Sequence, residues 1–195
     1  MTQPIIIFEG MPRVGKTTLS NQLKDTFGYG LIPEIHPDIR ELFNMREVQD
    51  QNVFMLNDRL KIALACSSNH KLTVMDRGGI STLAYHTHKD RSMGDNPWMA
   101  TIENEFNDKW LPLYQLDNVL TIYLNGRSEP WQKDSSDPYG SLSSLGLLSD
   151  ITIECIQKVG AKYMIVDYDY EDKGSFDMIS KIVLEYIASA QRDIK

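Results

Sequence analysis

Cysteine is scarce in this sequence, because only Cys66 and Cys155 occur among its 195 residues. Two cysteines cannot form the disulfide framework of a small secreted domain, and they lack the spacing of a zinc site. The start of the chain also lacks the basic segment and the long apolar segment of a secretory signal. We therefore expect reduced thiols in a cytoplasmic protein.

Long apolar runs and an excess of positive charge are also absent. The longest apolar runs hold about five residues, whereas a helix needs about 20 to cross a bilayer. The net charge is −7 at pH 7, and proteins that bind duplex nucleic acid or anionic membranes usually carry a basic excess. We therefore expect neither partner, while a local basic cleft for a small phosphate compound is compatible with this charge.

The residues that are present have a globular composition, with 42% hydrophobic and 24% charged side chains. Short apolar runs alternate with segments of helical periodicity, which predicts βαβ units. We expect a three-layer α/β fold in one domain over residues 1–195, with a five-stranded parallel sheet flanked by helices. Strands are predicted at 5–8, 30–33, 72–75, 119–124 and 163–166. Helices are predicted at 15–27, 48–68, 79–88, 98–111 and 176–190, and a further helix before the fifth strand ends at about residue 159. Residues 125–150, rich in Ser, Gly, Asp and Pro, predict a lid-like loop that leads into a helix.

A phosphate-binding loop follows the first predicted strand. Residues 10–17 fit the pattern G-x-x-x-x-G-K-[ST], in which glycines let the main chain curl so that its N–H groups point at phosphate oxygens. The following helix adds its positive N-terminal end, Lys16 reaches the β- and γ-phosphates, and the Thr17 hydroxyl ligates Mg²⁺. The residues expected to bind ATP are Gly10, Met11, Pro12, Arg13, Val14, Gly15, Lys16, Thr17 and Thr18.

An acidic and a basic residue, Asp76 and Arg77, follow the third predicted strand directly. Catalytic groups gather at the carboxyl ends of strands in such sheets. Asp76 is therefore expected to hold Mg²⁺ together with Thr17, and Arg77 to stabilise charge on a transferred phosphoryl group. The guanine-reading sequence Asn-Lys-x-Asp of GTPases is absent. This pattern favours phosphoryl transfer from ATP.

Several segments together resemble the thymidylate kinase and deoxynucleoside kinase group of P-loop enzymes. They are Phe8-Glu9-Gly10 running into Gly15-Lys16-Thr17-Thr18, residues 53–60, and the run from Asp76-Arg77 to Ala84-Tyr85-His86. Glu34, just after the second predicted strand, sits where this group places a glutamate. The resemblance covers most of residues 5–124.

This resemblance implies a kinase that uses ATP and Mg²⁺ to phosphorylate a small-molecule acceptor, a deoxynucleoside or a nucleoside monophosphate. It implies that Glu34 accepts the proton of the acceptor or helps to organise Mg²⁺. Arg13 would lie against the transferred phosphate, and Arg77 would bridge donor and acceptor. The residues implied to line the acceptor pocket are Asn52, Arg59 and Tyr85. Dimerisation is common in this group, and a homodimer is compatible with the sequence.

Departures from the pattern of the group leave the acceptor open. Ile35 replaces the proline that usually follows the glutamate, His86 stands where glutamine is usual, and the predicted lid offers only Arg127 and Lys133 as cations. Two other readings therefore stay open. One is a kinase of the same fold that acts on another small hydroxyl compound, and the other is a regulatory ATP-binding protein without transfer activity.

Two of the candidate residues also have structural explanations. Glu34 lies in a segment, residues 33–38, that fits a turn in which Asp38 caps a following helix. Arg59 lies on an apolar helix face, where an arginine needs a partner. A structural ion pair explains that position as well as a substrate contact does.

Overall fold

Five parallel strands form one sheet in the computed structural model, which describes residues 3–43, 51–126 and 142–192. The strands are β1 (Ile5–Gly10), β2 (Gly30–Ile32), β3 (Thr73–Asp76), β4 (Val119–Asn125) and β5 (Tyr163–Asp167), in the spatial order β2-β3-β1-β4-β5. The central strand is β1, in which Ile6 lies opposite Val74 of β3 and Leu120 of β4. The predicted five-stranded parallel sheet is confirmed, and its strands end at one common edge.

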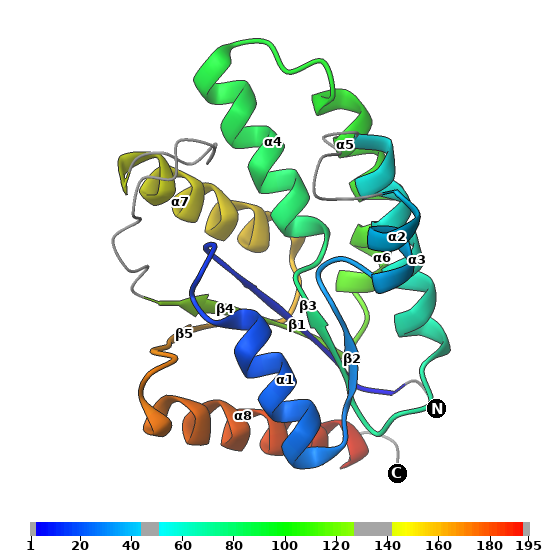
Figure 1. Ribbon diagram of the computed structural model, residues 1–195, viewed down its shortest axis with the longest axis vertical. Helices are drawn as coiled ribbons and strands as arrows, with labels where there is room; N and C mark the ends of the chain where they lie inside the picture. Colours follow the sequence, from blue (N-terminus) through cyan, green and yellow to red (C-terminus); the bar gives the residue numbers. More distant parts are fainter. Residues whose placement is uncertain (1–2, 44–50, 127–141, 193–195) are drawn as a thin grey trace.

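Helices cover both faces of the sheet and give the fold its three layers (Figure 1). Figure 1 shows α1 and α8 on one side of the sheet and α4 and α7 on the other, and α4 packs against α7. The helices are α1 (Lys16–Phe27), α2 (Pro37–Leu42), α3 (Gln51–Ser67), α4 (Gly79–Met93), α5 (Met99–Glu105), η1 (Phe106–Trp110), α6 (Leu111–Tyr114), α7 (Leu142–Val159) and α8 (Lys173–Arg192). In the part of the chain that the structure describes, none of these helices meets the length and apolarity of a membrane span.

The hydrophobic core lies between the sheet and these helices. The side chains of Ile5–Phe8 are all buried, as expected for a parallel strand that is covered on both faces. Helix α1 adds Leu19 and Leu23, which lie one turn apart and are fully buried. Helix α8 adds Ile179 and Val183 with the same spacing. This packing fixes the carboxyl ends of the strands relative to one another.

Local caps move two helix boundaries away from the predicted ones. Helix α4 continues beyond residue 88 and ends at Met93, and its C-cap is Gly94, whose φ of 74° lies in the left-handed region that favours glycine. Helix α8 begins three residues before the predicted start. Its cap is Asp172, whose two carboxylate oxygens accept the main-chain N–H groups of Gly174 and Ser175.

A short helix, α2, follows β2, where the sequence analysis offered a helix with Asp38 as its cap. It begins at Pro37, and its cap is His36, whose ring nitrogen accepts the N–H of Asp38 at 3.4 Å. The expectation that Asp38 caps a helix is therefore wrong. Proline is favoured at the first helical position because its missing N–H would have no helical partner there.

The helix predicted at 98–111 is interrupted by a π-helical turn, η1. The N–H of Leu111 donates to the carbonyl of Phe106, five residues earlier, and Pro112 has no N–H to continue an α-helical ladder. Trp110, at the end of this turn, is buried at 2% exposure. A methyl group on Gly79 would lie 2.3 Å from the Trp110 ring. The start of α4 therefore packs directly on this turn.

Helix α7 begins inside the segment predicted as a loop. The side chains of Leu145, Leu148, Ile151 and Ile156 are buried, and this apolar face outweighs the loop-like composition. The prediction of a loop at 125–150 is therefore wrong for residues 142–150, which belong to α7. Residues 127–141, with Arg127 and Lys133, lie outside the described residues, as do residues 44–50.

Candidate functional site

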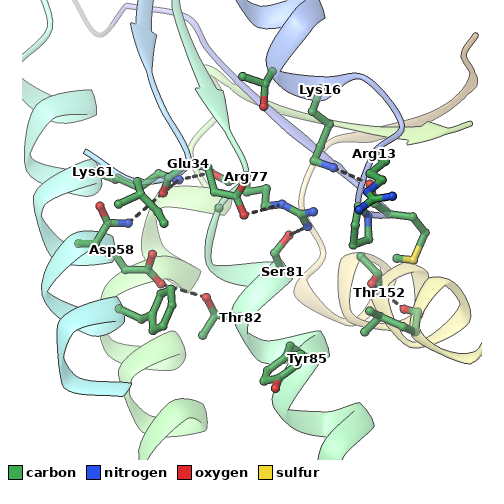
Figure 2. Close-up of a pocket in the computed structure, with 18 of the residues that line it drawn as sticks. Arg13, Lys16, Glu34, Asp58, Lys61, Arg77, Ser81, Thr82, Tyr85 and Thr152 are labelled. Carbon is green, nitrogen blue, oxygen red and sulfur yellow. Dashed lines mark hydrogen bonds and ion pairs between the residues drawn. The ribbon is translucent and has the colours of Figure 1, made fainter. Parts of the chain in front are cut away.

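A cleft of about 1030 Å³ opens at the edge where β1, β2 and β3 end (Figure 2). One end, called the loop half here, is lined by the loop after β1 and the start of α1. The other end, called the helix half, is lined by α3 and α4. Small-molecule pockets measure roughly 300–1,000 Å³, so this cleft lies at the upper end of that range.

The loop after β1 curls around the ammonium group of Lys16. Arg13 and Gly15 have φ angles of 66° and 86°, and Lys16 Nζ donates to the carbonyl oxygens of Gly10 at 3.0 Å and Met11 at 2.6 Å. Burial, with a further contribution from the positive charge of Arg77, lowers the pKa of Lys16 to about 7. A phosphate group beside this nitrogen would favour its charged form.

Most of the residues expected to bind ATP line the loop half. They are Met11, Pro12, Arg13, Gly15, Lys16, Thr17 and Thr18. Gly10 and Val14 are not among the lining residues, because Gly10 ends β1 against the Leu124 carbonyl and the Val14 side chain is 1% exposed in the core. Gly10 and Val14 therefore attach the loop to the sheet and the core and do not contact the cleft.

Thr17 and Asp76 meet beneath the loop half. Thr17 Oγ1 donates to Asp76 Oδ2 at 2.5 Å. Asp76 is buried, and its other oxygen, Oδ1, has no partner among the described residues. A hydroxyl oxygen and a carboxylate with an unpaired oxygen are ligands that Mg²⁺ prefers. The two residues therefore fit a magnesium site.

Arg77 lies between the two halves of the cleft, as Figure 2 shows. Its Nε is 2.9 Å from Glu34 Oε1, and its Nη1 donates to the Gly10 carbonyl at 3.2 Å and to Ser81 Oγ at 3.1 Å. The main chain of Arg77 has a φ of 61°, a left-handed conformation that costs about 1 kcal/mol for a residue other than glycine. Packing therefore holds Arg77 in a strained conformation, from which its side chain reaches Gly10 at the end of β1 and Glu34 just after β2.

A buried lysine that the sequence analysis missed, Lys61, joins these strand ends from α3. Its Nζ donates to the carbonyl oxygens of Asp76 at 2.9 Å, Arg77 at 2.7 Å and Glu34 at 3.4 Å. Lys61 is 1% exposed, and burial lowers its pKa. One turn earlier, Asn57 accepts the N–H of His36 and donates to the Glu34 carbonyl. Together Asn57 and Lys61 hold the segment that carries Glu34.

A second buried charge, Glu9 of β1, holds the start of α4. It accepts the Gly78 N–H at 3.0 Å and the Tyr114 hydroxyl at 3.1 Å, and the Ser81 hydroxyl also donates to it. Burial raises the pKa of Glu9. Because Ser81 accepts from Arg77 at the same time, Glu9 contributes to the position of Arg77 through one intervening side chain.

The helix half contains a carboxylate, Asp58 of α3, that the sequence analysis also missed. Asp58 Oδ2 accepts from Thr82 Oγ1 of α4 at 3.2 Å, and Phe54 and Tyr85 line the cleft beside it. Burial raises the pKa of Asp58 to about 6. The carboxylate can accept hydrogen bonds from a ligand in this half.

Gln51 lines the same half and is held by a chain of side chains. Asn96 Nδ2 donates to His86 Nδ1 at 3.0 Å and to the His86 carbonyl at 2.9 Å. This leaves the ring proton on His86 Nε2, which lies 2.8 Å from Gln51 Oε1. Burial lowers the pKa of His86 and favours its neutral form. Gln51 Nε2 is buried and has no partner within the described ranges, so it can donate to a ligand.

Two residues implied by the resemblance lie away from the cleft. Arg59 is turned outward and forms a bidentate pair with Glu105, with Nε–Oε1 and Nη2–Oε2 distances of 2.6 and 2.7 Å. Asn52 is exposed and does not line the cleft. The buried face of α3 carries Val53, Asn57, Lys61 and Ala65, so this structure does not bring Asn52 and Arg59 to the acceptor pocket that the resemblance implies for them. Tyr85 and Glu34 do line the cleft.

Solved structures with this fold include several kinases. Thymidylate kinase from Candida albicans is 18% identical, with 97% of this chain and 93% of that chain covered and a TM-score of 0.62. Deoxyadenosine kinase from M. mycoides with bound dATP is 16% identical, with 92% and 98% covered and a TM-score of 0.63. NadR protein in complex with NAD and AMP-PNP is 17% identical, with 96% and 50% covered and a TM-score of 0.63.

Sequence comparison identifies the family. No curated protein sequence matches this chain significantly. The sequence profile of a family described as an AAA domain matches residues 5–173, which is most of the chain. The chain therefore belongs to this AAA-domain family, and its fold is that of the P-loop thymidylate and deoxynucleoside kinases.

Proposed function

We propose that this protein is an ATP- and Mg²⁺-dependent kinase that phosphorylates a deoxynucleoside or a nucleoside monophosphate. The observation that carries this proposal is the position of Arg77 and Glu34. They form an ion pair between a phosphate-binding loop and a second, separately lined half of the same cleft. A protein that only binds ATP needs no such second half.

The loop half would bind ATP through the loop N–H groups and Lys16, with Arg13 against the γ-phosphate. Thr17 and Asp76 would hold Mg²⁺, which neutralises charge on the phosphates when it is bound. The acceptor would lie in the helix half, with Arg77 between the two. These placements follow from the residues that line each half, and phosphoryl transfer depends mostly on such positioning and charge stabilisation.

For a hydroxyl acceptor, the oxygen attacks the γ-phosphorus of ATP. A bond forms between the acceptor oxygen and phosphorus while the bond from phosphorus to the bridging oxygen breaks, and ADP leaves with that oxygen. The acceptor proton passes to the Glu34 carboxylate, which is half exposed and forms an ion pair with Arg77. Arg77 stabilises the negative charge on the transferred group.

An ADP-release assay with the common nucleosides and their monophosphates tests this function, and Glu34→Gln separates transfer from binding. We expect Glu34→Gln to lower acceptor-dependent turnover about 100-fold, because a general base contributes 10²–10⁴-fold. ATP affinity, measured by calorimetry, should stay within about twofold. Glu41→Gln on the exposed side of α2 is the matched control. Tight ATP binding without turnover on any acceptor would instead favour a regulatory ATP-binding protein.

Two further expectations stay predictions. A homodimer would be seen as twice the mass of the 22.3 kDa chain by light scattering. A cytoplasmic location would be seen by fractionation of the source cells.

A further inference from the structure

Helix α3 presents a carboxylate to the helix half of the cleft at a place where the sequence suggested an arginine. Asp58 lines the cleft and is bonded to Thr82. Its neighbour Arg59 points to the other side of the helix, where Glu105 holds it with two hydrogen bonds. Lys61 of α3 also lines the cleft, but its Nζ is bonded to main-chain carbonyl oxygens, so the α3 charge that can accept a hydrogen bond from a ligand is the Asp58 carboxylate.

The cations close to Asp58 and Glu34 are already bonded to other groups. Lys61 donates to three main-chain carbonyl oxygens. Arg77 is paired with Glu34 and also donates to Gly10 and Ser81. Lys89 lines the cleft, but it lies seven residues beyond Thr82 on α4, about 10 Å along the helix axis. Within the described ranges, the two cations around the middle of the helix half, Lys61 and Arg77, are thus already engaged with protein groups.

A phosphate monoester is a poor match for these surroundings. It carries about two negative charges near pH 7 and offers only hydrogen-bond acceptors to its neighbours, so Glu34 and Asp58 would repel it. A nucleoside is uncharged, and its hydroxyl and amino groups donate hydrogen bonds that carboxylates accept. The side chains of Phe54, Tyr85 and Trp98 also line the cleft and offer apolar surface for a planar ring.

We propose that the acceptor enters this cleft as an uncharged nucleoside rather than as a nucleoside monophosphate, and that Asp58 accepts a hydrogen bond from it. This inference rests on the proposed kinase function, because it names the acceptor of that same cleft. Of the two acceptor classes in the proposed function, nucleosides and nucleoside monophosphates, it selects the nucleosides.

Direct binding tests the acceptor class without requiring turnover. Calorimetry with the full-length protein, Mg²⁺ and a non-hydrolysable ATP analogue would compare thymidine, deoxycytidine, deoxyadenosine and deoxyguanosine with their 5′-monophosphates. We expect at least one nucleoside to bind at least about tenfold more tightly than its own monophosphate, since hydrogen bonds to charged groups give differences of this size. Tighter binding of the monophosphates, or binding of no member of either set, overturns the proposal.

The variant Asp58→Asn tests the assigned contact. It should weaken binding of the preferred nucleoside about tenfold, because the charge-assisted hydrogen bond is lost, and it should leave the affinity for the ATP analogue within about twofold. Asp108→Asn, an exposed aspartate of η1, is the matched control and should change neither affinity. An unchanged nucleoside affinity in Asp58→Asn overturns the role of Asp58.

Two measurements separate failure of this inference from failure of the proposed function. If nucleosides bind as expected but no ADP is released, the assignment of the helix half to a nucleoside stands and the kinase function fails. If monophosphates bind more tightly and are phosphorylated, the kinase function stands and the acceptor inference fails. Thermal unfolding of each variant shows whether a lost affinity comes from a lost fold.

Discussion

The two halves of the cleft are built in different ways. The loop half is formed by one continuous stretch, residues 10–18, and much of what it offers a ligand is main chain. The helix half is formed by side chains of α3 and α4, which are separate in the sequence and depend on buried contacts such as those of Lys61 and Asn57. A local motif is thus sufficient for one half, whereas the other depends on tertiary packing.

The halves also differ in charge. The loop half presents Lys16 and Arg13 to a ligand. The helix half presents Asp58, while the ammonium group of Lys61 is bonded to main-chain carbonyl oxygens. Mutations in the loop half should therefore affect phosphate binding, and mutations in the helix half should affect acceptor handling or stability. Four predictions test this division.

Lys16→Met should have the largest effect, because it removes the cation that the loop surrounds. We expect a loss of about 1000-fold in ATP-dependent turnover, the upper end for removal of one stabilising donor, and strongly weakened ATP binding by calorimetry. Lys24→Met, at an exposed position on the same helix, is the control. Retained ATP affinity in Lys16→Met would contradict the assignment of the loop half.

Lys61→Met should damage the helix half but spare the loop half. The change leaves three carbonyl oxygens without this donor. Because an unsatisfied buried polar group costs about 1–3 kcal/mol, we expect a loss of about 2–3 kcal/mol in the free energy of unfolding by urea titration. Acceptor-dependent turnover should fall more than ATP affinity. Lys71→Met, at an exposed site, should change stability by less than about 0.5 kcal/mol.

Asp58 should make stability depend on pH in the helix half. Burial raises its pKa from 3.8 to about 6, so between these values the folded protein holds a proton that the unfolded chain has released. The stabilisation is complete below pH 3.8 and is lost as the pH rises through 6, by an amount on the order of 2 kcal/mol. Asp58→Asn should lose this part of the slope when unfolding is measured from pH 4 to pH 8. An identical slope in both proteins would show that Asp58 titrates normally.

Arg59→Gln should have the smallest effect. Arg59 is exposed and paired with Glu105 outside the cleft, and exposed ion pairs contribute about 0–1 kcal/mol. We expect stability to change by less than about 1 kcal/mol and acceptor-dependent turnover by less than about twofold. A large loss of turnover would place Arg59 in the acceptor site, as the resemblance implied.

The sequence was sufficient to predict the fold, the phosphate-binding loop and the strand ends that carry Glu34 and Asp76. Each of these depends on a short local pattern, such as an apolar run or a glycine-rich loop. Parallel topology then places the strand ends at one edge without any knowledge of side-chain contacts.

The helix half could not be predicted in the same way. The sequence of α3 has apolar residues on several faces, so its periodicity did not show that Asn57 and Lys61 point inward. The partner of Arg59, Glu105, is 46 residues away, and only packing of α3 against α5 shows that they meet. Polar residues with buried partners look like surface residues in a sequence, which is why Lys61 and Asp58 were missed.

Helix α3 lines the cleft with Gln51, Asp58, Asn57 and Lys61, of which Asn57 and Lys61 are bonded to the main chain at the strand ends. If the proposed function holds, a library of variants limited to positions 51, 54 and 58 should therefore change which acceptor binds, while the contacts of Asn57 and Lys61 with the strand ends stay in place.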